Sequence, residues 1–318
     1  MSRKGLYLDH VYRITLSLLD LGSSPGAPIR NENTNLRVGI FLSIVIVMDQ
    51  AKITFGRGFF HKYKSLTGNN LNHALEIIET LGIYCPKPSE LNDEDEFCPI
   101  FTAAKLSEEG YRTEIEKWVR RCISTRGLIP TEAQIQAELK ALNQDRLDAI
   151  AVELSKQFYE EVNKKHRVIS MTNSPRNHHL WSEYAKDYSG ICFEFRISPW
   201  LATMYEVEYV NQPKLLDLAS NADFEQLKVV ALTKNTKWVD EAEFRMVLSV
   251  PPIDDGPVVV NNKLYLLPHM LTSIYFGFKI DPIHLQTLLK AIMKSIPHVR
   301  RFLVYGGVPY KDVIAVRL

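Results

Sequence analysis

The sequence has 318 residues, 46% of them hydrophobic, which is enough for one large folded domain or two smaller ones. Lys and Arg number 38 and Asp and Glu 37, so no global positive charge attracts nucleic acid or membranes in general. The four cysteines include no C-x-x-C pair, which indicates neither a zinc knuckle nor a disulfide framework and favours reduced thiols in a cytoplasmic protein.

The first 58 residues are predicted to form a loose, partly disordered N-terminal extension, because Gly22–Pro28 and Asn31–Asn35 have loop-like compositions. The apolar run Val38–Met48 holds about eleven residues, whereas a membrane-spanning helix needs roughly 20. A buried strand or short core helix is therefore predicted there. Met48 precedes a more regular pattern, which raises the hypothesis that the native chain starts downstream of Met1.

From about residue 59 to the end of the chain, the pattern predicts one folded domain. The strand-like segment Phe60–Leu66 and a helix at Asn72–Leu81 open it. A helical insertion is expected over about 105–165, because apolar residues recur twice there at helical spacing. Thr131, three residues before Gln134, fits a capping box and gives the second of these helices a start.

The following segment alternates strands and helices. Ser174-Pro175 has the form of a cap and a first helical residue, so a helix is predicted from there until Gly190. Ile191–Phe195 has the period of a strand with one buried face. In the next clear strand, Glu243 and Arg245 share a face that is expected to look at solvent or a cleft.

The C-terminal part completes the predicted sheet. Asn261-Asn262 is expected to form a two-residue hairpin turn, and Leu271–Phe278 a strand. Asp281-Pro282 opens a helix to about Ser295, and two last strands surround Gly306-Gly307. These elements predict the α+β class, with a mixed or antiparallel split β-sheet core, flanking helices and the helical insertion.

The densest group of chemically capable residues includes Glu241 and Glu243. On an extended chain, residues two apart point to one side, and paired carboxylates shift one another's pKa values and can divide acid and base roles. The alternative is a solvated strand edge whose carboxylates pair with Lys237 and Arg245. Surface ion pairs are common and weak, so spacing alone favours this alternative.

Other candidate residues carry weaker signals. Ser170 and Thr172 lie two residues apart near the end of a predicted strand, so their hydroxyls lie on one face. One interpretation is that they bind a polar ligand group; the alternative is a sheet residue followed by residues that cap the next helix. Trp181 and Tyr184 lie three apart on one helical face, a spacing more typical of core packing. The adjacent histidines His178-His179 point about 100° apart on a helix and have no third ligand at suitable spacing, so no metal is expected. The sequence contains neither a phosphate-binding glycine loop nor a nucleophile elbow.

Taken together, these segments resemble the bacterial family called domain of unknown function 2971. The order and spacing match across residues 60 to 295, and the sequence departs from the family at Glu94-Asp95-Glu96, where a proline and a phenylalanine are usual. The residues that carry the resemblance are Lys62-Tyr63-Lys64, Leu91-Asn92-Asp93, Ser170, Leu180–Ala185, Gly190–Phe195, Lys237-Trp238 and Glu241–Arg245.

The order of parts is also similar to that of the ADP-ribosyltransferases, in which a basic residue, a serine-x-serine or serine-x-threonine strand and a glutamate-x-glutamate strand follow one another. Lys62 stands here in place of the usual arginine. The resemblance implies NAD as substrate and no metal. It implies catalytic roles for Glu243, Glu241 and Ser170, cofactor contacts for Lys62, Tyr63, Thr172, Trp181 and Tyr184, and substrate contacts for Asn92, Asp93, Trp238 and Arg245.

The resemblance further implies an NAD-dependent toxin or anti-phage effector that modifies an unknown protein or nucleic-acid acceptor, acts away from membranes, and has an antitoxin or regulatory partner. The chief alternative is a non-catalytic binding or regulatory protein that uses the same charged cleft as a partner surface. A metal-dependent nuclease or hydrolase built on Asp93, Glu243 and His178 is a third interpretation, with a poor ligand pattern.

Overall fold

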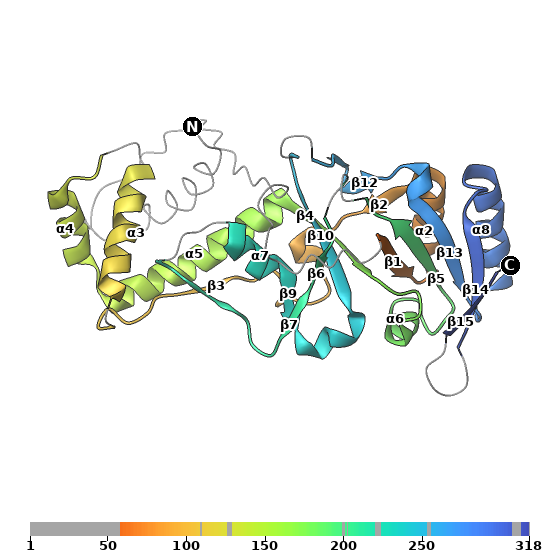
Figure 1. Ribbon diagram of the computed structural model, residues 1–318, viewed down its shortest axis with the longest axis horizontal. Coiled ribbons are helices and arrows are strands. Elements are labelled where there is room, and N and C mark those ends of the chain that lie inside the picture. Colours follow the sequence, from red (N-terminus) through yellow and green to blue (C-terminus); the bar gives the residue numbers. More distant parts are fainter. Residues whose placement is uncertain are drawn as a thin grey trace. The chain divides into compact units, whose positions relative to one another are not determined.

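The structure, a computed structural model, describes residues 58–108, 110–125, 129–198, 201, 203–219, 224–252, 256–306 and 313–317. The expected N-terminal extension, including the Val38–Met48 run, lies outside these residues apart from Gly58. The chain divides into two compact units (Figure 1). We call them the helical unit, which contains Leu91–Lys165 and Gln212–Thr233, and the sheet unit, which contains the described residues up to Glu90, His166–Asn211 and those from Lys234 onward.

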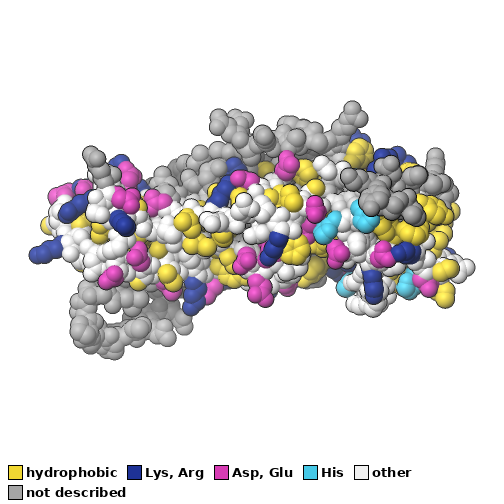
Figure 2. Space-filling view, turned by 90° about the horizontal axis from the view of Figure 1, so that it is seen from below, with side chains coloured by type: hydrophobic (Ala, Val, Ile, Leu, Met, Phe, Trp, Pro, Cys, Tyr) yellow, Lys and Arg dark blue, Asp and Glu magenta, His cyan; other side chains and the backbone are white. Residues whose placement is uncertain are grey.

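The surface carries both charges. On the face shown in Figure 2, Lys and Arg side chains are interspersed with Asp and Glu side chains. This mixture agrees with the formal net charge of +1. Within the described ranges, the helices lack an apolar stretch of the length that crossing a membrane requires. The four cysteines are free thiols.

The helical unit contains four helices and one short parallel strand pair among its described residues. The capping box is confirmed: Thr131 Oγ1 accepts from Gln134 N at 3.3 Å. The helix it starts is nevertheless α4, which ends at Ala141, so the predicted start of the long helix is wrong. Asn143 Oδ1 accepts from Arg146 N at 2.9 Å and caps that helix. The elements are α3 (Tyr111–Thr125), α4 (Glu132–Ala141), α5 (Gln144–Lys165), α7 (Phe224–Leu232), β3 (Ile100–Thr102) and β8 (Leu215–Asp217).

The sheet unit is built on an eight-stranded mixed sheet, and together the two units confirm the α+β class. All of its ladders are antiparallel except β13–β14. Its strands, in spatial order, are β15 (Val313–Arg317), β14 (Arg300–Gly306), β13 (Leu271–Gly277), β5 (Ile191–Arg196), β1 (Phe59–Lys64), β4 (His166–Thr172), β10 (Glu243–Ser249) and β6 (Tyr205–Glu206).

Short elements complete the sheet unit. The small sheets are β11 (Val259–Val260), β12 (Lys263–Tyr265) and β2 (Gly82–Tyr84), and the pair β7 (Glu208–Val210) and β9 (Thr233–Asn235). The helices are α2 (Asn70–Thr80), α6 (His178–Glu183), α8 (Pro282–Ser295) and the 3-10 turns η1 (Pro88–Glu90), η2 (Thr236–Glu241) and η3 (Pro268–Met270).

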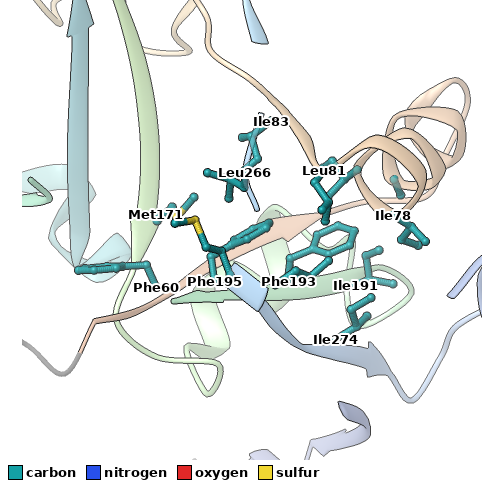
Figure 3. Packing of buried hydrophobic residues seen from close by; sticks show 14 of the residues in the cluster. Phe60, Ile78, Leu81, Ile83, Met171, Ile191, Phe193, Phe195, Leu266 and Ile274 are labelled. Carbon is teal, nitrogen blue, oxygen red and sulfur yellow. The ribbon is translucent and has the colours of Figure 1, made fainter. Parts of the chain in front are cut away.

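One face of the large sheet carries the main hydrophobic core. Phe193 and Phe195 of β5 and Met171 of β4 lie in one cluster with Ile78 of α2 (Figure 3). The same cluster includes Ile292 of α8. Burying such side chains stabilises the fold by roughly 1.5–3 kcal/mol each. Helices α2 and α8 therefore cover this face, which we call the core face.

The opposite face is also buried, and we call it the polar face. Every residue of Ile191–Phe195 is buried, so the expectation of one buried face on this strand is wrong. Cys192 and Glu194 point away from the core face, and Trp181 of α6 belongs to a second apolar cluster with Cys192 and Tyr63. The strand alternates as predicted, but α6 and its neighbouring loops cover the side that alternation alone would assign to solvent.

Helix α6 is shorter than predicted. It begins after Asn177, whose Oδ1 accepts from Leu180 N at 3.1 Å, and not at Ser174-Pro175. It ends at Glu183, and Lys186, Asp187 and Tyr188 follow in left-handed conformations. A Cβ on Gly277 would lie 2.1 Å from Tyr188 O, so this tight turn packs directly against the backbone of β13.

The C-terminal predictions are confirmed. Asn261 and Asn262 form the hairpin turn between β11 and β12 with φ of 52° and 58°, values typical of a type I′ turn. Helix α8 starts after Asp281, whose Oδ1 accepts from Ile283 N at 2.7 Å. The two predicted last strands are β14, which ends at Gly306, and β15, and they pair in antiparallel fashion.

Candidate functional site

The carboxylates of Glu241 and Glu243 converge on one ammonium. Lys234 Nζ lies 2.6 Å from Glu241 Oε2 and 3.1 Å from Glu243 Oε2. The convergence arises from a turn and not from an extended strand, because Glu241 ends η2 and Ala242 has the left-handed conformation, with φ 45°. All three charged residues are buried, with 4–5% of their surface exposed.

Arg245 binds the carboxylate of Glu243. Its Nε donates to Glu243 Oε1 at 2.6 Å and its terminal nitrogen to Oε2 at 3.0 Å, in a bidentate pair. Burial alone would raise the pKa of Glu243, but the charge and hydrogen bonds of Arg245, then Lys234 and a hydrogen bond from Ser170, lower that pKa to about 2. Glu243 is therefore ionised at neutral pH.

The alternation of β10 led us to expect that Glu243 and Arg245 face solvent or a cleft. In the structure their side chains are buried instead. Arg245 has 0% of its surface exposed and Glu243 has 4%. Strand β10 lies inside the sheet between β4 and β6, and both of its faces are covered. Two carboxylates and two cations, Lys234 and Arg245, thus form a buried cluster whose formal charges sum to zero, which we call the carboxylate cluster.

Ser170 and Thr172 lie beside this cluster on the neighbouring strand. In the β4–β10 ladder Ser170 faces Arg245 and Thr172 faces Glu243. Directly opposed residues have Cβ atoms roughly 4.5–5.5 Å apart on the same face. The structure therefore brings Ser170 and Thr172 together with Glu241, Glu243 and Arg245, although the two groups came from separate segments of the sequence.

The side chain of Lys62 lies on the core face of the sheet, opposite to the face that carries Glu243. It is opposed to Phe193, a core-face residue, whereas its neighbour His61 is opposed to Thr172. Lys62 Nζ donates to the backbone oxygen of Ser170 at 3.2 Å. Burial, helped by Lys64, lowers the pKa of Lys62 to about 8. The structure thus brings Lys62 to the Ser170 backbone but not to the face on which the Glu243 side chain lies.

The aromatic candidates divide into packing residues and one partner of the cluster. Tyr63 packs edge-on against the buried Trp181 at 5.2 Å, and its hydroxyl donates to Ser174 O at 2.9 Å. Tyr184 is 36% exposed, and its hydroxyl donates to Glu241 Oε1 at 2.5 Å. Only Tyr184 among these three therefore contacts the carboxylate cluster by a hydrogen bond that the structure resolves.

The predicted substrate residues lie in different places. Trp238 of η2 packs beside Lys234, whose Nζ is 5.1 Å from the ring centroid. Asn92 and Asp93 follow η1 and belong to the helical unit, where Asp93 is buried. In the parts of the chain that the structure describes, no three His, Cys, Asp or Glu side chains gather in the manner of metal ligands.

Four residues of this region had no predicted role. Lys234 binds both carboxylates, and the Tyr209 hydroxyl accepts from Glu243 N at 2.8 Å. His61 and Glu194 lie on the polar face and join at 3.2 Å. A charged residue within a strand-like pattern, such as Glu194 in Ile191–Phe195, is a signal that could have marked this side of the sheet.

The comparisons with known proteins return no match: no family model, no curated protein and no solved structure aligns with the chain.

Proposed function

We propose that the chain is an NAD-dependent ADP-ribosyltransferase-like enzyme, of the toxin or anti-phage effector kind, with Glu243 as its catalytic carboxylate. One observation carries the proposal: Glu241 and Glu243 share Lys234 in a buried cluster beside Ser170 and Thr172. Replacing a buried ion cluster by apolar residues is often neutral or stabilising, so such clusters contribute little to stability. Ionisable residues with strongly shifted pKa values, such as Glu243, are concentrated at functional sites, which supports a chemical role for this cluster.

The charge state of Glu243 suits the cleavage of NAD. Breaking the bond between nicotinamide and ribose builds positive charge on the ribose, as in glycoside hydrolysis. An ionised carboxylate stabilises that charge as it grows, which lowers the barrier more than it strengthens ground-state binding. The lowered pKa of Glu243, with Arg245 beside its buried carboxyl, keeps that charge available at any physiological pH.

The contacts of the carboxylate limit how a ribose can bind. A carboxylate has roughly four acceptor positions. Arg245 takes two, Lys234 one, and Ser170 supplies a further hydrogen bond. A ribose hydroxyl therefore replaces the Ser170 or Lys234 contact in the complex. When a ribose hydroxyl displaces Lys234, the contact between Lys234 and Glu241 also weakens. The Glu241 carboxylate then orients the acceptor nucleophile.

Burial favours this proposal over a partner-binding surface. A docking surface needs accessible side chains, whereas Arg245 and Glu243 have 0% and 4% of their surfaces exposed. A small substrate that enters a closed site uses such residues without requiring a broad exposed face.

The test measures nicotinamide release from NAD and label transfer from NAD to bacterial lysate components. We expect wild-type activity and a loss of roughly 10²–10³-fold in Glu243→Gln. Glu183→Gln, the same change at an exposed position of α6, is the control and should leave activity unchanged. Circular dichroism verifies that both variants fold. Intact NAD after long incubation of wild-type protein with lysate overturns the proposal.

A further inference from the structure

A single transverse row crosses five strands on the polar face. Ser273 of β13 is opposed to Glu194 of β5, and Glu194 to His61 of β1. His61 is opposed to Thr172 of β4, and Thr172 to Glu243 of β10. Residues opposed in this way lie on the same face of a sheet with Cβ atoms roughly 4.5–5.5 Å apart. The carboxylate cluster is therefore one end of a longer polar row.

Glu194 is the acceptor at the other end of the row. Its carboxylate accepts hydrogen bonds from His61 Nε2 at 3.2 Å and from Tyr275 OH at 2.8 Å. It also accepts from Thr272 Oγ1 and Ser273 Oγ at 2.6 Å each. A terminal nitrogen of Arg300 adds a contact of 3.0 Å. Burial alone would raise the pKa of Glu194, but the hydrogen bonds from His61, Ser273, Thr272 and Tyr275 outweigh it and hold that pKa well below its usual range.

The ionised Glu194 determines how His61 hydrogen-bonds. A carboxylate without a proton only accepts, so the proton of His61 lies on Nε2, which faces it. In the neutral ring Nδ1 is then an acceptor. On the side away from β5, His61 is opposed to Thr172, and Thr172 in turn is opposed to Glu243.

Two opposed residues in the middle of the row each carry a buried polar atom. Among the described residues, His61 Nδ1 and Thr172 Oγ1 are both buried and have no hydrogen-bond partner. Leaving one such group unsatisfied costs about 1–3 kcal/mol. His61 is 3% exposed and Thr172 1%, so bulk water does not satisfy them. A hydroxyl group matches both atoms, because it donates to the nitrogen and accepts from the threonine hydroxyl.

We propose that His61 and Thr172 bind a hydroxyl of a sugar ligand next to Glu243, and that Glu194 is the positioning residue that keeps the His61 proton on Nε2. Glu243 accepts from a second, neighbouring hydroxyl, so the row selects a vicinal diol. This inference rests on the proposed function, and it adds His61 as a ligand contact and Glu194 as a residue that acts through it.

The experiment follows the ring nitrogens of His61 by NMR in the full chain labelled with ¹⁵N-histidine, with the resonance assigned by its loss in His61→Asn. In wild-type protein we expect the proton on Nε2, and addition of ADP-ribose should shift the Nδ1 resonance. In Glu194→Gln the ring should lose this fixed tautomer and the affinity for ADP-ribose should fall at least tenfold. Glu183→Gln makes the same change at an exposed position of α6 and should change neither.

The outcomes separate this inference from the proposed function. A proton on Nδ1 in the wild-type protein overturns the inference, as does an Nδ1 resonance that ADP-ribose leaves unchanged. The latter result means that an ordered water, and not a ligand, fills the position. If ADP-ribose shifts Nδ1 while NAD stays intact with every lysate, the sugar site stands and the transferase proposal fails. If NAD is consumed while Nδ1 does not respond, the reverse holds.

Discussion

The Lys234 ammonium lies 2.6 Å from a Glu241 carboxylate oxygen, with both side chains buried in the sheet unit. The same ammonium reaches Glu243 at 3.1 Å, so one cation separates two carboxylates that would otherwise repel each other. This arrangement makes the cluster sensitive to the loss of any one member, and four predictions follow from it and from the packing around it.

Lys234→Met should destabilise the protein by about 3–5 kcal/mol at pH 7, because it leaves two buried carboxylates without their shared cation. Urea unfolding at pH 7 measures the loss. Lys237→Met, at an exposed neighbouring position, is the control and should cost less than about 1 kcal/mol. Equal losses in the two variants would show that burial of Lys234 is not the cause.

Glu243 should contribute to acid sensitivity in a defined pH window. Its pKa falls from 4.5 to about 2 on folding, so the folded state binds the proton less tightly than the unfolded state. The resulting stability is fully present above about pH 4.5 and is lost as the pH falls through about 2, with an upper bound of about 3 kcal/mol. Between pH 5 and 2.5 the unfolding free energy of wild type should fall more steeply than that of Glu243→Gln; parallel curves would contradict this.

Arg245 and Glu243 should be strongly coupled. Arg245→Met should cost about 3–5 kcal/mol, because it leaves a buried carboxylate without its bidentate partner. A double-mutant cycle with Glu243→Gln should give a coupling energy of about 1–3 kcal/mol in urea unfolding. Lys117 and Glu114, whose side chains are 56% and 49% exposed, provide the matched cycle, where about 0.5 kcal/mol or less is expected. Similar couplings in both cycles would rule out a special contribution of burial.

Gly277→Ala should destabilise the sheet unit severely, by more than about 3 kcal/mol, because its Cβ would lie 2.1 Å from the Tyr188 backbone oxygen. Gly68→Ala is the comparison: Gly68 has φ +59° but no atom within 4 Å of an added Cβ, so only backbone strain of about 1 kcal/mol is expected. Thermal unfolding of both variants measures the difference. A mild effect at Gly277 would mean that the left-handed turn at Tyr188 yields easily.

Much of the local structure follows from the sequence because it depends on neighbouring residues. The Asn261-Asn262 turn, the Asp281 cap and the alternation of Ile191–Phe195 each rest on contacts within a few positions. The capping box at Thr131 was correct for the same reason, although the length of its helix was not. The two-residue spacing of Glu241 and Glu243 likewise marked the carboxylate pair, but not the turn that joins it.

Only the tertiary structure decided what surrounds that pair. Lys62 and His61 are adjacent, and alternation puts one on each face, but only the pairing of β1 with β4 and β5 determines which one joins the row of Thr172 and Glu243. A register shift of one residue would exchange them. The burial of Arg245 likewise depends on strands β4 and β6 on either side and on the covering of both faces. The sequence by itself therefore determined the residue types and local spacings of the candidate site, and long-range strand pairing determined its composition, its charge balance and its burial.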